Sequence, residues 1–502
     1  MTTLPRVFSV VAVVVLLPLV SARAEDLDAT FAALESRWQT AIDELDIPGL
    51  SVAVVYNDKV VYAKGFGRRR VDPDLPFTPD TACYIASSTK PFTAFGIMTL
   101  VDQGKVNLDA PVKTYLPRFD LPDHDLAEKI TVRDLLCHRY GLDNSIITFA
   151  EAYTGLWNDD FFFRELPRSS GVKGSWQYSN LHFTIAGRII EAVTGMPWQE
   201  YLRQVIFTPL GMSHSTARAS ELYAYDNVAI GLLKENGAWK VSSMLKSDMT
   251  MHAAGGIGAS ALDLAQWVRL QMSDGTVNGK RIISQASLAE MFKDNIDAAD
   301  DFAPFDRGPM GLAWYLGGYR GEKMIHHFGG YVAYAAHVSF MPKHKLGVIA
   351  LANSDAVGAG FIHQVACDVY DRVLGLSSED TMPAFRERAQ AAMARRAEQR
   401  AKVPPLSDAP LDLSKPIKAY TGTFTSDRWG TLVLTRDGDR LVGTLGNLPL
   451  TFHADQTDRL TMGYALGREV ATFIFDDSRK MNEVRIASYG PYTMVFTRND
   501  AP

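Results

Sequence analysis

The order of hydrophobic and polar positions predicts a helix followed by a β-hairpin near the start of the chain. Residues 27–45 carry apolar side chains at every third or fourth position, the spacing of one helix face, and Pro48-Gly49 ends the pattern. Residues 50–56 and 60–66 are rich in β-branched and aromatic side chains, and the polar residues between them are typical of a tight turn. A sheet is therefore expected to begin directly after the first helix.

Helical patterns dominate the middle of the chain, from residue 87 to about residue 264. The clearest helical segments are residues 90–103, 132–138, 181–193 and 262–272. Strand patterns then return at residues 323–327, 335–341 and 346–352. A further helix is expected at residues 362–374. The simplest closure pairs early and late strands in one antiparallel sheet, with the helical region inserted between them.

The composition changes after Leu376. Residues 377–416 are first rich in Ala, Arg and Glu and then contain several prolines, which is typical of a linker between domains. Residues 417–502 predict a small antiparallel β-barrel of lipocalin-like type, because short alternating strands are separated by turn signals. The expected strands cover residues 430–435, 440–445, 469–475, 483–487 and 492–498. The expected fold class is α/β of the α+β type, with an antiparallel sheet flanked by helices, a helical subdomain and this C-terminal barrel.

Residues 1–24 predict a cleaved secretory signal. Arg6 precedes an uncharged apolar run over residues 7–20, and the small residues of Ala22-Arg23-Ala24 suit signal cleavage. A membrane anchor is the alternative, but the run is shorter than the ~20 residues of a spanning helix and contains Pro18. We therefore expect residues 25–376 to form the main domain of a periplasmic or secreted protein, with no stable membrane span after cleavage.

Composition and charge exclude several classes of protein. The 502 residues include 51 Lys plus Arg and 57 Asp plus Glu, a net charge of -6, so no nucleic-acid partner is expected. The three cysteines are an odd number without a C-x-x-C motif, which argues against a disulfide framework. Cys137 and His138 are neighbours that cannot face each other on a helix, so core packing is the preferred interpretation of Cys137.

Several catalytic motifs are missing from the sequence. There is no G-x-S-x-G nucleophile elbow, no H-E-x-x-H zinc motif, no P-loop and no strand-linked G-x-G-x-x-G. His326-His327 is the only adjacent histidine pair, but consecutive strand residues point to opposite faces and cannot bind one zinc ion together. We therefore expect neither a metal site nor another cofactor.

The motif S-x-x-K can place a serine hydroxyl one helical turn from an activating lysine. It occurs three times, as Ser87/Lys90, Ser170/Lys173 and Ser243/Lys246. Ser170 lies beside glycines and Ser243 in an aperiodic stretch, so no helix fixes their spacing. Ser87 instead precedes Pro91 and an apolar helical segment, whose N-terminus offers backbone N–H groups for an oxyanion. Taken alone, Ser87 is equally compatible with a helix cap.

Two further elements complete a candidate acyl-transfer site. Tyr178 and Asn180 stand two apart, so both can point into one cleft, and an amphipathic helix follows them. His327, Gly329 and Gly330 end a strand beside this cleft, where glycines allow a ligand to approach the backbone closely. Two competing matches lack a following helix or fall in a solvated turn and are discounted: Tyr225/Asn227 and Lys345/Gly347.

With Ser87/Lys90, Tyr178/Asn180 and His327/Gly329 in this order, the chain resembles the serine β-lactamase and penicillin-recognising family. The likeness is to the branch of class C lactamases, serine peptidases S12, D-aminopeptidases and family VIII esterases, over about residues 27–375. Supporting stretches are residues 47–52, 135–142, 254–257 and 346–353. Two departures are Tyr140, where the family often has Ser, and His327, which replaces the lysine of class C lactamases.

The resemblance implies a serine hydrolase that acts through a covalent acyl-serine. Ser87 would attack a carbonyl, and Lys90 and Tyr178 would form the base, each favouring the other's deprotonated or charged form. Backbone N–H groups of Ser87 and Gly330 would bind the oxyanion. The residues expected to bind substrate or the oxyanion are Asn180, His327, Gly329 and Gly330. No metal or other cofactor takes part in this chemistry.

The substrate is less well defined, because lactamases, D-peptidases and esterases share this fold and machinery. His327 is mostly neutral near neutral pH and is a weaker partner for a substrate carboxylate than lysine. We therefore expect a D-amino acid-containing peptide or an ester, including peptidoglycan-derived fragments, and a small-molecule or short-peptide partner. The alternatives are a β-lactamase, a D-Ala-D-Ala carboxypeptidase and a catalytically silent sensor, and an oligomer is compatible with the sequence.

Overall fold

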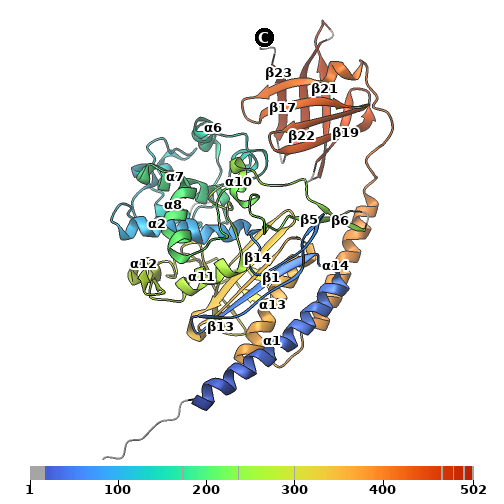
Figure 1. Ribbon diagram of the computed structural model, residues 1–502. Coiled ribbons are helices and arrows are strands. Elements are labelled where there is room, and N and C mark those ends of the chain that lie inside the picture. The colour runs from blue at the N-terminus through green and yellow to red at the C-terminus, as the bar shows by residue number, and fades with distance from the viewer. Residues whose placement is uncertain are drawn as a thin grey trace, which may run out of the picture.

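The computed structural model describes residues 17–499, apart from 172–173, 236, 299, 355, 465–466, 479 and 490–491. A central β-sheet is flanked by helices, a group of shorter helices lies beside it, and a β-barrel stands apart at the C-terminal end (Figure 1). Residues 1–16 of the predicted signal lie outside the described residues, and the first helix, α1 (Leu17–Leu45), begins within its remainder. The described part of the chain contains no helix with the length and apolar character that crossing a bilayer requires.

The central sheet has nine strands within the described residues, in the order β10-β11-β12-β13-β14-β15-β1-β2-β3. β1 (Gly49–Tyr56) pairs in antiparallel fashion with β15 (Leu346–Ala352), so that Val52 lies opposite Ala350. This pairing of an early with a late strand confirms the closure expected from the sequence. The other strands are β2 (Lys59–Val71), β3 (Asp74–Pro76), β10 (Asp301–Phe302), β11 (Phe305–Asp306), β12 (Tyr315–Tyr319), β13 (Glu322–Tyr331) and β14 (Tyr334–Met341).

Helices cover both faces of this sheet, and the side chains of β1 show how. Val52 packs in a buried cluster with Trp38 of α1, a cluster that also includes residues of α13 (Ala356–Leu374). Its neighbour Ala53 belongs instead to the cluster that contains Trp267 of α11 (Ala261–Gln271). Because successive strand residues point to opposite faces, the sheet separates an outer helical layer from the helical region. The candidate site lies on the side of the helical region.

The inserted region contains the helices predicted for it. Its longer helices are α2 (Lys90–Asp102), α4 (Val132–Leu136), α5 (Ser145–Phe149), α6 (Asp159–Glu165), α7 (Asn180–Thr194), α8 (Trp198–Leu202) and α12 (Gln285–Glu290). Short helical turns include η1 (Ala86–Thr89), α3 (His124–Ala127), η3 (Ala150–Thr154), α9 (Thr208–Leu210), α10 (Ala219–Leu222) and η6 (Asp248–Thr250). The two-residue strands β4 (Cys83–Tyr84) and β7 (Gly258–Ala259) pair with each other. This pairing places the segment just before Ser87 beside the segment just before α11.

The C-terminal part forms the predicted antiparallel barrel, and the barrel is closed. Its strands are β16 (Gly422–Ser426), β17 (Gly430–Asp437), β18 (Arg440–Leu445), β19 (Leu448–Gln456), β20 (Arg459–Tyr464), β21 (Gly467–Phe475), β22 (Met481–Tyr489) and β23 (Tyr492–Arg498). β16 pairs with β23, which removes both free sheet edges. β16, β19 and β20 were not among the strands expected from the sequence.

The stretch predicted as a linker, residues 377–416, contains the helix α14 (Met382–Lys402). Met382 is buried, and Phe385 and Met393 pack against the cluster that joins α1 to α13. α14 therefore runs along the main domain before the chain reaches the barrel (Figure 1). The division of the chain into domains at residues 376 and 417 stays a prediction.

The barrel contacts the helical region through two of its turns. In one turn, the backbone N–H of Asn447 donates to the Thr154 carbonyl at 2.9 Å. In the other, Arg428 donates to the Glu165 carboxylate at 3.0 and 3.2 Å. Glu165 is fully buried, and Arg168 donates to its second oxygen at 2.6 Å. The barrel is thus attached to the segment of the helical region that runs from η3 to α6.

Replacing Arg428 by alanine should loosen this attachment. The buried Glu165 carboxylate would keep Arg168 but lose a charge-assisted hydrogen-bond partner, at a cost of about 1–3 kcal/mol. We expect faster protease cleavage between α14 and the barrel, measured as the rate at which the barrel fragment appears. Arg436→Ala is the control, because Arg436 pairs with Asp439 inside one barrel hairpin. Equal cleavage rates in both variants and the parent protein would contradict the expectation.

Candidate active site

Ser87 lies at the junction between β4 and α2. Ala86 has a left-handed backbone conformation with φ 47°, which costs a non-glycine residue about 1–2 kcal/mol. The 3₁₀ turn η1 then carries Ser87, and Lys90 is the first residue of α2. Ser87 is partly exposed, whereas Lys90 is fully buried. The serine can therefore meet a substrate while its lysine neighbour is kept from water.

The Lys90 side chain joins three parts of the site. Its Nζ lies 3.1 Å from Ser87 Oγ, 2.8 Å from Asn180 Oδ1 and 2.8 Å from the Ala254 carbonyl oxygen. Burial lowers the pKa of Lys90 well below its ordinary value. A neutral amine at this distance can accept the proton of the Ser87 hydroxyl.

Ser87 does not act as a helix cap. The N-cap position of η1 is Ile85 and that of α2 is Thr89, so Ser87 occupies neither. Neither helix begins with a side-chain cap hydrogen bond. The Ser87 hydroxyl instead has polar partners in the Lys90 amine and the Tyr178 hydroxyl. The capping alternative raised by the sequence is therefore wrong.

Tyr178 covers Lys90 on one side. The Lys90 Nζ lies 4.7 Å from the centre of the Tyr178 ring, and the His138 ring stacks on Tyr178 with ring centres also 4.7 Å apart. His138 is fully buried and accepts a hydrogen bond from the Ser179 backbone N–H at 3.1 Å. Burial raises the pKa of Tyr178 above its ordinary value, while a hydrogen bond with Ser87 acts in the opposite direction. His138 thus holds the tyrosine in place, a role that the sequence analysis missed.

Asn180 is placed by the start of α7. The Ser179 side chain caps this helix by accepting the His182 backbone N–H at 3.3 Å, and Asn180 is the first helical residue. This geometry confirms that a helix follows the Tyr178/Asn180 pair. It fixes the Asn180 amide oxygen where Lys90 donates to it.

β13 forms the opposite side of the site and is held against η1. Ser88 Oγ donates to the His327 carbonyl at 3.1 Å. A Cβ atom on Gly329 would lie 2.0 Å from the Ile85 carbonyl oxygen, so only glycine allows this close approach. A Cβ atom on Gly330 would meet nothing within 4 Å. The two glycines therefore have different roles: Gly329 permits the contact, and Gly330 leaves open space.

The His327 side chain is buried beside Tyr178, with ring centres 6.3 Å apart. Its Nδ1–H donates to the Phe328 carbonyl at 2.9 Å, and its Nε2 has no hydrogen-bond partner among the described residues. Burial, reinforced by the charge of Lys90, lowers the pKa of His327 well below its ordinary value. The ring is therefore neutral near neutral pH, with one nitrogen that a substrate could use.

The structure brings the three predicted motifs together at one place, where hydrogen bonds and ring contacts join Ser87, Lys90, Tyr178, Asn180 and His327. Of the competing S-x-x-K pairs, Lys173 lies outside the described residues, and Ser170 and Ser243 are exposed. The three cysteines are buried and free, and Cys137 packs in a hydrophobic cluster as expected. Over the described ranges, no group of His, Cys, Asp and Glu side chains is arranged to hold a metal ion.

Lys246, from the discounted Ser243/Lys246 pair, is a buried lysine beside the candidate site. Its Nζ donates to the Ala152 carbonyl at 2.8 Å and lies 3.8 Å from the centre of the Tyr331 ring and 5.3 Å from that of Tyr84. Tyr331 directly follows Gly330 in β13. Burial lowers the pKa of Lys246 to about 7. The S-x-x-K match at Ser243/Lys246 did not indicate this position, because the neighbours of Lys246 come from distant parts of the chain.

Replacing Lys246 by methionine should stabilise the protein, more at acidic than at alkaline pH. The pKa is about 7 in the folded chain against an ordinary value of 10.5, so the unfolded chain binds the proton more tightly. Stability is therefore lost as the pH falls from 10.5 to about 7. Methionine keeps an unbranched stem and removes this titration. Thermal unfolding should show a higher midpoint for the variant at about pH 6 and a smaller difference at about pH 10; a pH-independent difference would contradict this account.

Comparisons with known proteins identify the family to which the chain is similar. Residues 28–363 match the family described as Beta-lactamase. The protein flp of Staphylococcus aureus (strain MW2) is 27% identical over 313 residues, which cover 61% of this chain and 60% of that protein. The match to this curated relative thus spans about 60% of its length.

Two solved structures share the fold. The octameric penicillin-binding protein homologue from Pyrococcus abyssi is 25% identical with a TM-score of 0.58, over 93% of this chain and 100% of that chain. D-amino acid amidase from Ochrobactrum anthropi SV3, complexed with L-phenylalanine amide, is 22% identical with a TM-score of 0.58, over 68% of this chain and 99% of that chain. Because the family match extends over more than half of the chain and the fold agrees with it, this protein belongs to the beta-lactamase family.

Proposed function

We propose that the protein is a serine hydrolase and that Ser87 is the nucleophile that forms a covalent acyl-enzyme. The observation that carries this proposal is the pair of a partly exposed Ser87 hydroxyl and a fully buried Lys90 amine, 3.1 Å apart. Attack of Ser87 Oγ on a substrate carbonyl requires removal of the hydroxyl proton. The Lys90 Nζ lies 3.1 Å from the Ser87 oxygen that carries this proton, close enough for a neutral amine to accept it.

Lys90 is the better candidate for the base in the free site. Burial moves Lys90 toward its neutral form and Tyr178 toward its protonated form. The resemblance implied that Lys90 and Tyr178 would each favour the charged or deprotonated form of the other. Burial instead favours the neutral form of both side chains. In this proposal, Lys90 takes the Ser87 proton, and Tyr178, which shares a hydrogen bond with Ser87, donates its hydroxyl proton to the leaving group. The Lys90 ammonium then returns its proton to the Tyr178 oxygen, so that both side chains regain their starting forms.

The remaining residues bind the substrate and the developing charge. The Ser87 and Gly330 backbone N–H groups stabilise the oxyanion, and Asn180 Oδ1 orients Lys90. The open space beside Gly330 admits the substrate carbonyl. Water then attacks the acyl-serine and releases the acid.

We propose peptides or amides that contain D-amino acids, or esters, as substrates. The neutral, buried His327 can accept one hydrogen bond at Nε2 but supplies no charge for a carboxylate. This argues against a β-lactamase or a D-Ala-D-Ala carboxypeptidase, whose substrates carry a carboxylate. The fold shared with D-amino acid amidase supports an amide substrate. A silent sensor is the second candidate, and the intact Ser87/Lys90 contact argues against it.

Labelling by a fluorophosphonate probe tests the nucleophile, and a hydrolysis panel tests the substrate class. The panel comprises p-nitrophenyl esters, D-amino acid amides and nitrocefin. We expect a single label on Ser87 and hydrolysis of the esters or amides, with nitrocefin turned over slowest. A folded protein with neither label nor turnover would favour the sensor.

Activity should rise with pH, and the rising limb of the pH profile should reflect the deprotonation of Lys90. The reaction needs Lys90 without its proton, and burial lowers its pKa well below 10.5. kcat/KM should therefore increase as the pH rises through this lowered value, below the ordinary lysine range. Tyr178→Phe should lower the plateau but keep the limb. A limb that disappears in Tyr178→Phe would assign the titration to the tyrosine instead.

A further inference from the structure

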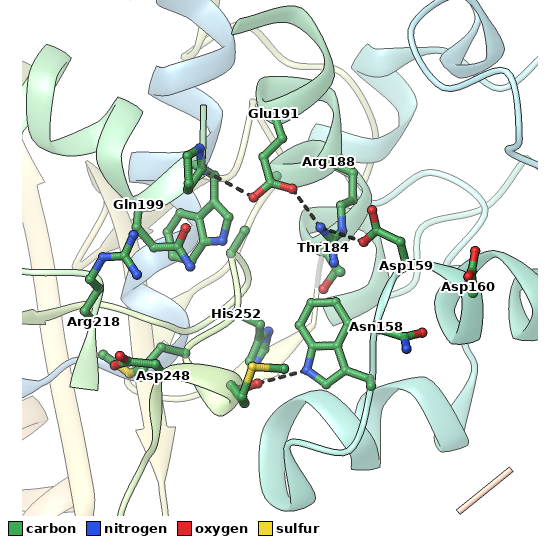
Figure 2. A pocket seen from close by; sticks show the side chains of 17 residues that line it. Asn158, Asp159, Asp160, Thr184, Arg188, Glu191, Gln199, Arg218, Asp248 and His252 are labelled. Atoms are coloured by element: carbon green, nitrogen blue, oxygen red, sulfur yellow. Dashed lines mark hydrogen bonds and ion pairs between the residues drawn. The ribbon is translucent and has the colours of Figure 1, made fainter. Parts of the chain in front are cut away.

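A cavity of about 590 Å³ lies outside the candidate active site. It is open to solvent on one side and is lined by the start of α6, the middle of α7, the start of α8, Arg218 and residues 248–253 (Figure 2). None of Ser87, Lys90, Tyr178, Asn180 and His327 lines it. It is large enough for a small organic molecule and is separate from the cleft in which we place the acyl-serine.

Two polar atoms of the lining are buried without a partner. His252 Nδ1 and Gln199 Oε1 have no hydrogen bond to any of the residues that the structure describes. The His252 side chain is only 7% exposed. Buried polar groups are nearly always hydrogen-bonded, so two unpartnered groups among the residues that line one cavity indicate a ligand there.

The charged side chains that could pair with a ligand lie on one side of the cavity. Figure 2 shows Arg218, Gln199 and Asp248 on one side, and Arg188, Glu191 and Asp159 on the other. On the second side the charges satisfy one another, because Arg188 pairs with Asp159 at 3.0 Å and with Glu191 at 2.7 Å. A ligand therefore finds its available charges on the first side.

Arg218 and Asp248 remain open to a ligand. Arg218 forms an ion pair with Glu221 at 3.8 Å, a distance that leaves its guanidinium N–H groups poorly used. The Asp248 carboxylate accepts the Ser220 N–H at 2.8 Å and the Ser220 hydroxyl at 2.7 Å, and it also interacts with the Ala219 N–H and the charge of Arg218. A carboxylate offers about four acceptor positions, so it can accept a further hydrogen bond. The two residues are thus a cationic and an anionic anchor at the same end of the cavity.

The rest of the lining is apolar enough to hold a side chain. Trp157, Trp198, Met249 and Met251 contribute to the wall, and the Trp157 indole N–H is already donated to the Met249 carbonyl at 2.9 Å. An adjacent positive and negative charge on the ligand, attached to an apolar group, would match this arrangement of Arg218, Asp248 and the aromatic wall.

We propose that this cavity binds a small zwitterion, a free α-amino acid with an apolar side chain. Its carboxylate pairs with Arg218, and its ammonium group donates to Asp248 and to Gln199 Oε1. Its side chain packs against Trp157 and the methionines. The wall that it contacts continues into the candidate active site, because the carbonyls of Ala253 and Ala254 accept Thr93 Oγ1 at 2.7 Å and Lys90 Nζ at 2.8 Å.

Calorimetric titration of the full-length chain tests the proposal with three probes. Phenylalanine has both charges, phenylalanine amide lacks the carboxylate, and N-acetylphenylalanine lacks the ammonium group. We expect phenylalanine to bind with one site per chain and each analogue to bind about 10- to 100-fold more weakly, the effect of losing one charge-assisted hydrogen bond. Equal binding of all three probes, or no binding of phenylalanine up to its solubility limit, would overturn the proposal.

Variants locate the binding in this cavity. Arg218→Gln and Asp248→Asn should each weaken phenylalanine binding about 10- to 100-fold. Arg203→Gln is the matched control, because Arg203 lies outside the cavity and pairs with Glu200 on the surface. Phenylalanine binding should also persist after fluorophosphonate has blocked Ser87. Binding that survives both cavity variants, or that is lost when Ser87 is labelled, would place the ligand in the active site and reject the proposal. The variants give this answer whether or not Ser87 proves to be the nucleophile.

Discussion

Replacing Ser87 by alanine is expected to lower kcat/KM by about 10⁴-fold or more. The substitution removes the only atom in the proposal that bonds to the substrate carbonyl, while Lys90 keeps its hydrogen bonds to Asn180 and Ala254. The geometry of the base is therefore preserved and the covalent route alone is lost. Hydrolysis of the preferred ester or amide measures the effect, and intact-mass analysis after fluorophosphonate treatment shows whether the acyl-accepting atom is gone.

The other S-x-x-K serines provide matched controls. Ser170 and Ser243 are both exposed, so Ser170→Ala and Ser243→Ala should leave activity and folding near normal. Thermal unfolding of all three variants separates a loss of chemistry from a loss of structure. Wild-type turnover in Ser87→Ala, with an inactive Ser243→Ala, would show that the nucleophile has been assigned to the wrong serine.

Most of the fold could be predicted, because its strands and helices carry local signals. The hairpin between β1 and β2 is one example: Asn57 and Asp58 have φ angles of 49° and 63°, the left-handed conformation that short turns require and that these residues tolerate. β19 was missed because Pro449 interrupts an otherwise alternating run, and proline usually argues against a strand. The side chain of Pro449 points outward from the barrel, where its exposed position tolerates it.

The candidate site was only partly predictable. Ser87 and Lys90 stand three apart in one turn of chain, so their contact is local and a sequence motif can record it. His138, which stacks on Tyr178, and the Ala254 carbonyl, which accepts from Lys90, reach the site through tertiary packing. A backbone carbonyl leaves no mark on the sequence, and a buried histidine resembles any other core residue. Lys246 was noted only as part of a discounted S-x-x-K pair, because its contacts with Tyr331 and Tyr84 are also tertiary.

Substitution of Gly329 by alanine should lower kcat/KM by about 100-fold, the order of effect expected when reacting groups move by about 1 Å. The new Cβ atom would lie 2.0 Å from the Ile85 carbonyl oxygen and 3.1 Å from the Ser88 nitrogen. Both are backbone atoms of the segment that carries Ser87, so they cannot rotate away as a side chain could. β13 and η1 must separate, which moves the Gly330 N–H away from the Ser87 hydroxyl and weakens the proposed oxyanion site.

Gly330→Ala is the matched control for this prediction, because it adds the same methyl group one residue further along β13. A Cβ atom on Gly330 meets nothing within 4 Å, and alanine keeps the backbone N–H that would bind the oxyanion. We expect Gly330→Ala to retain most of the activity on a small ester and to lose more on a bulky amide, which must share the open space. Steady-state kinetics of both variants on both substrates measures the contrast. If Gly329→Ala is as active as the parent protein, the contact between β13 and η1 does not control the site. If Gly330→Ala loses as much activity on the small ester as Gly329→Ala does, the space beside Gly330 is not free for the substrate.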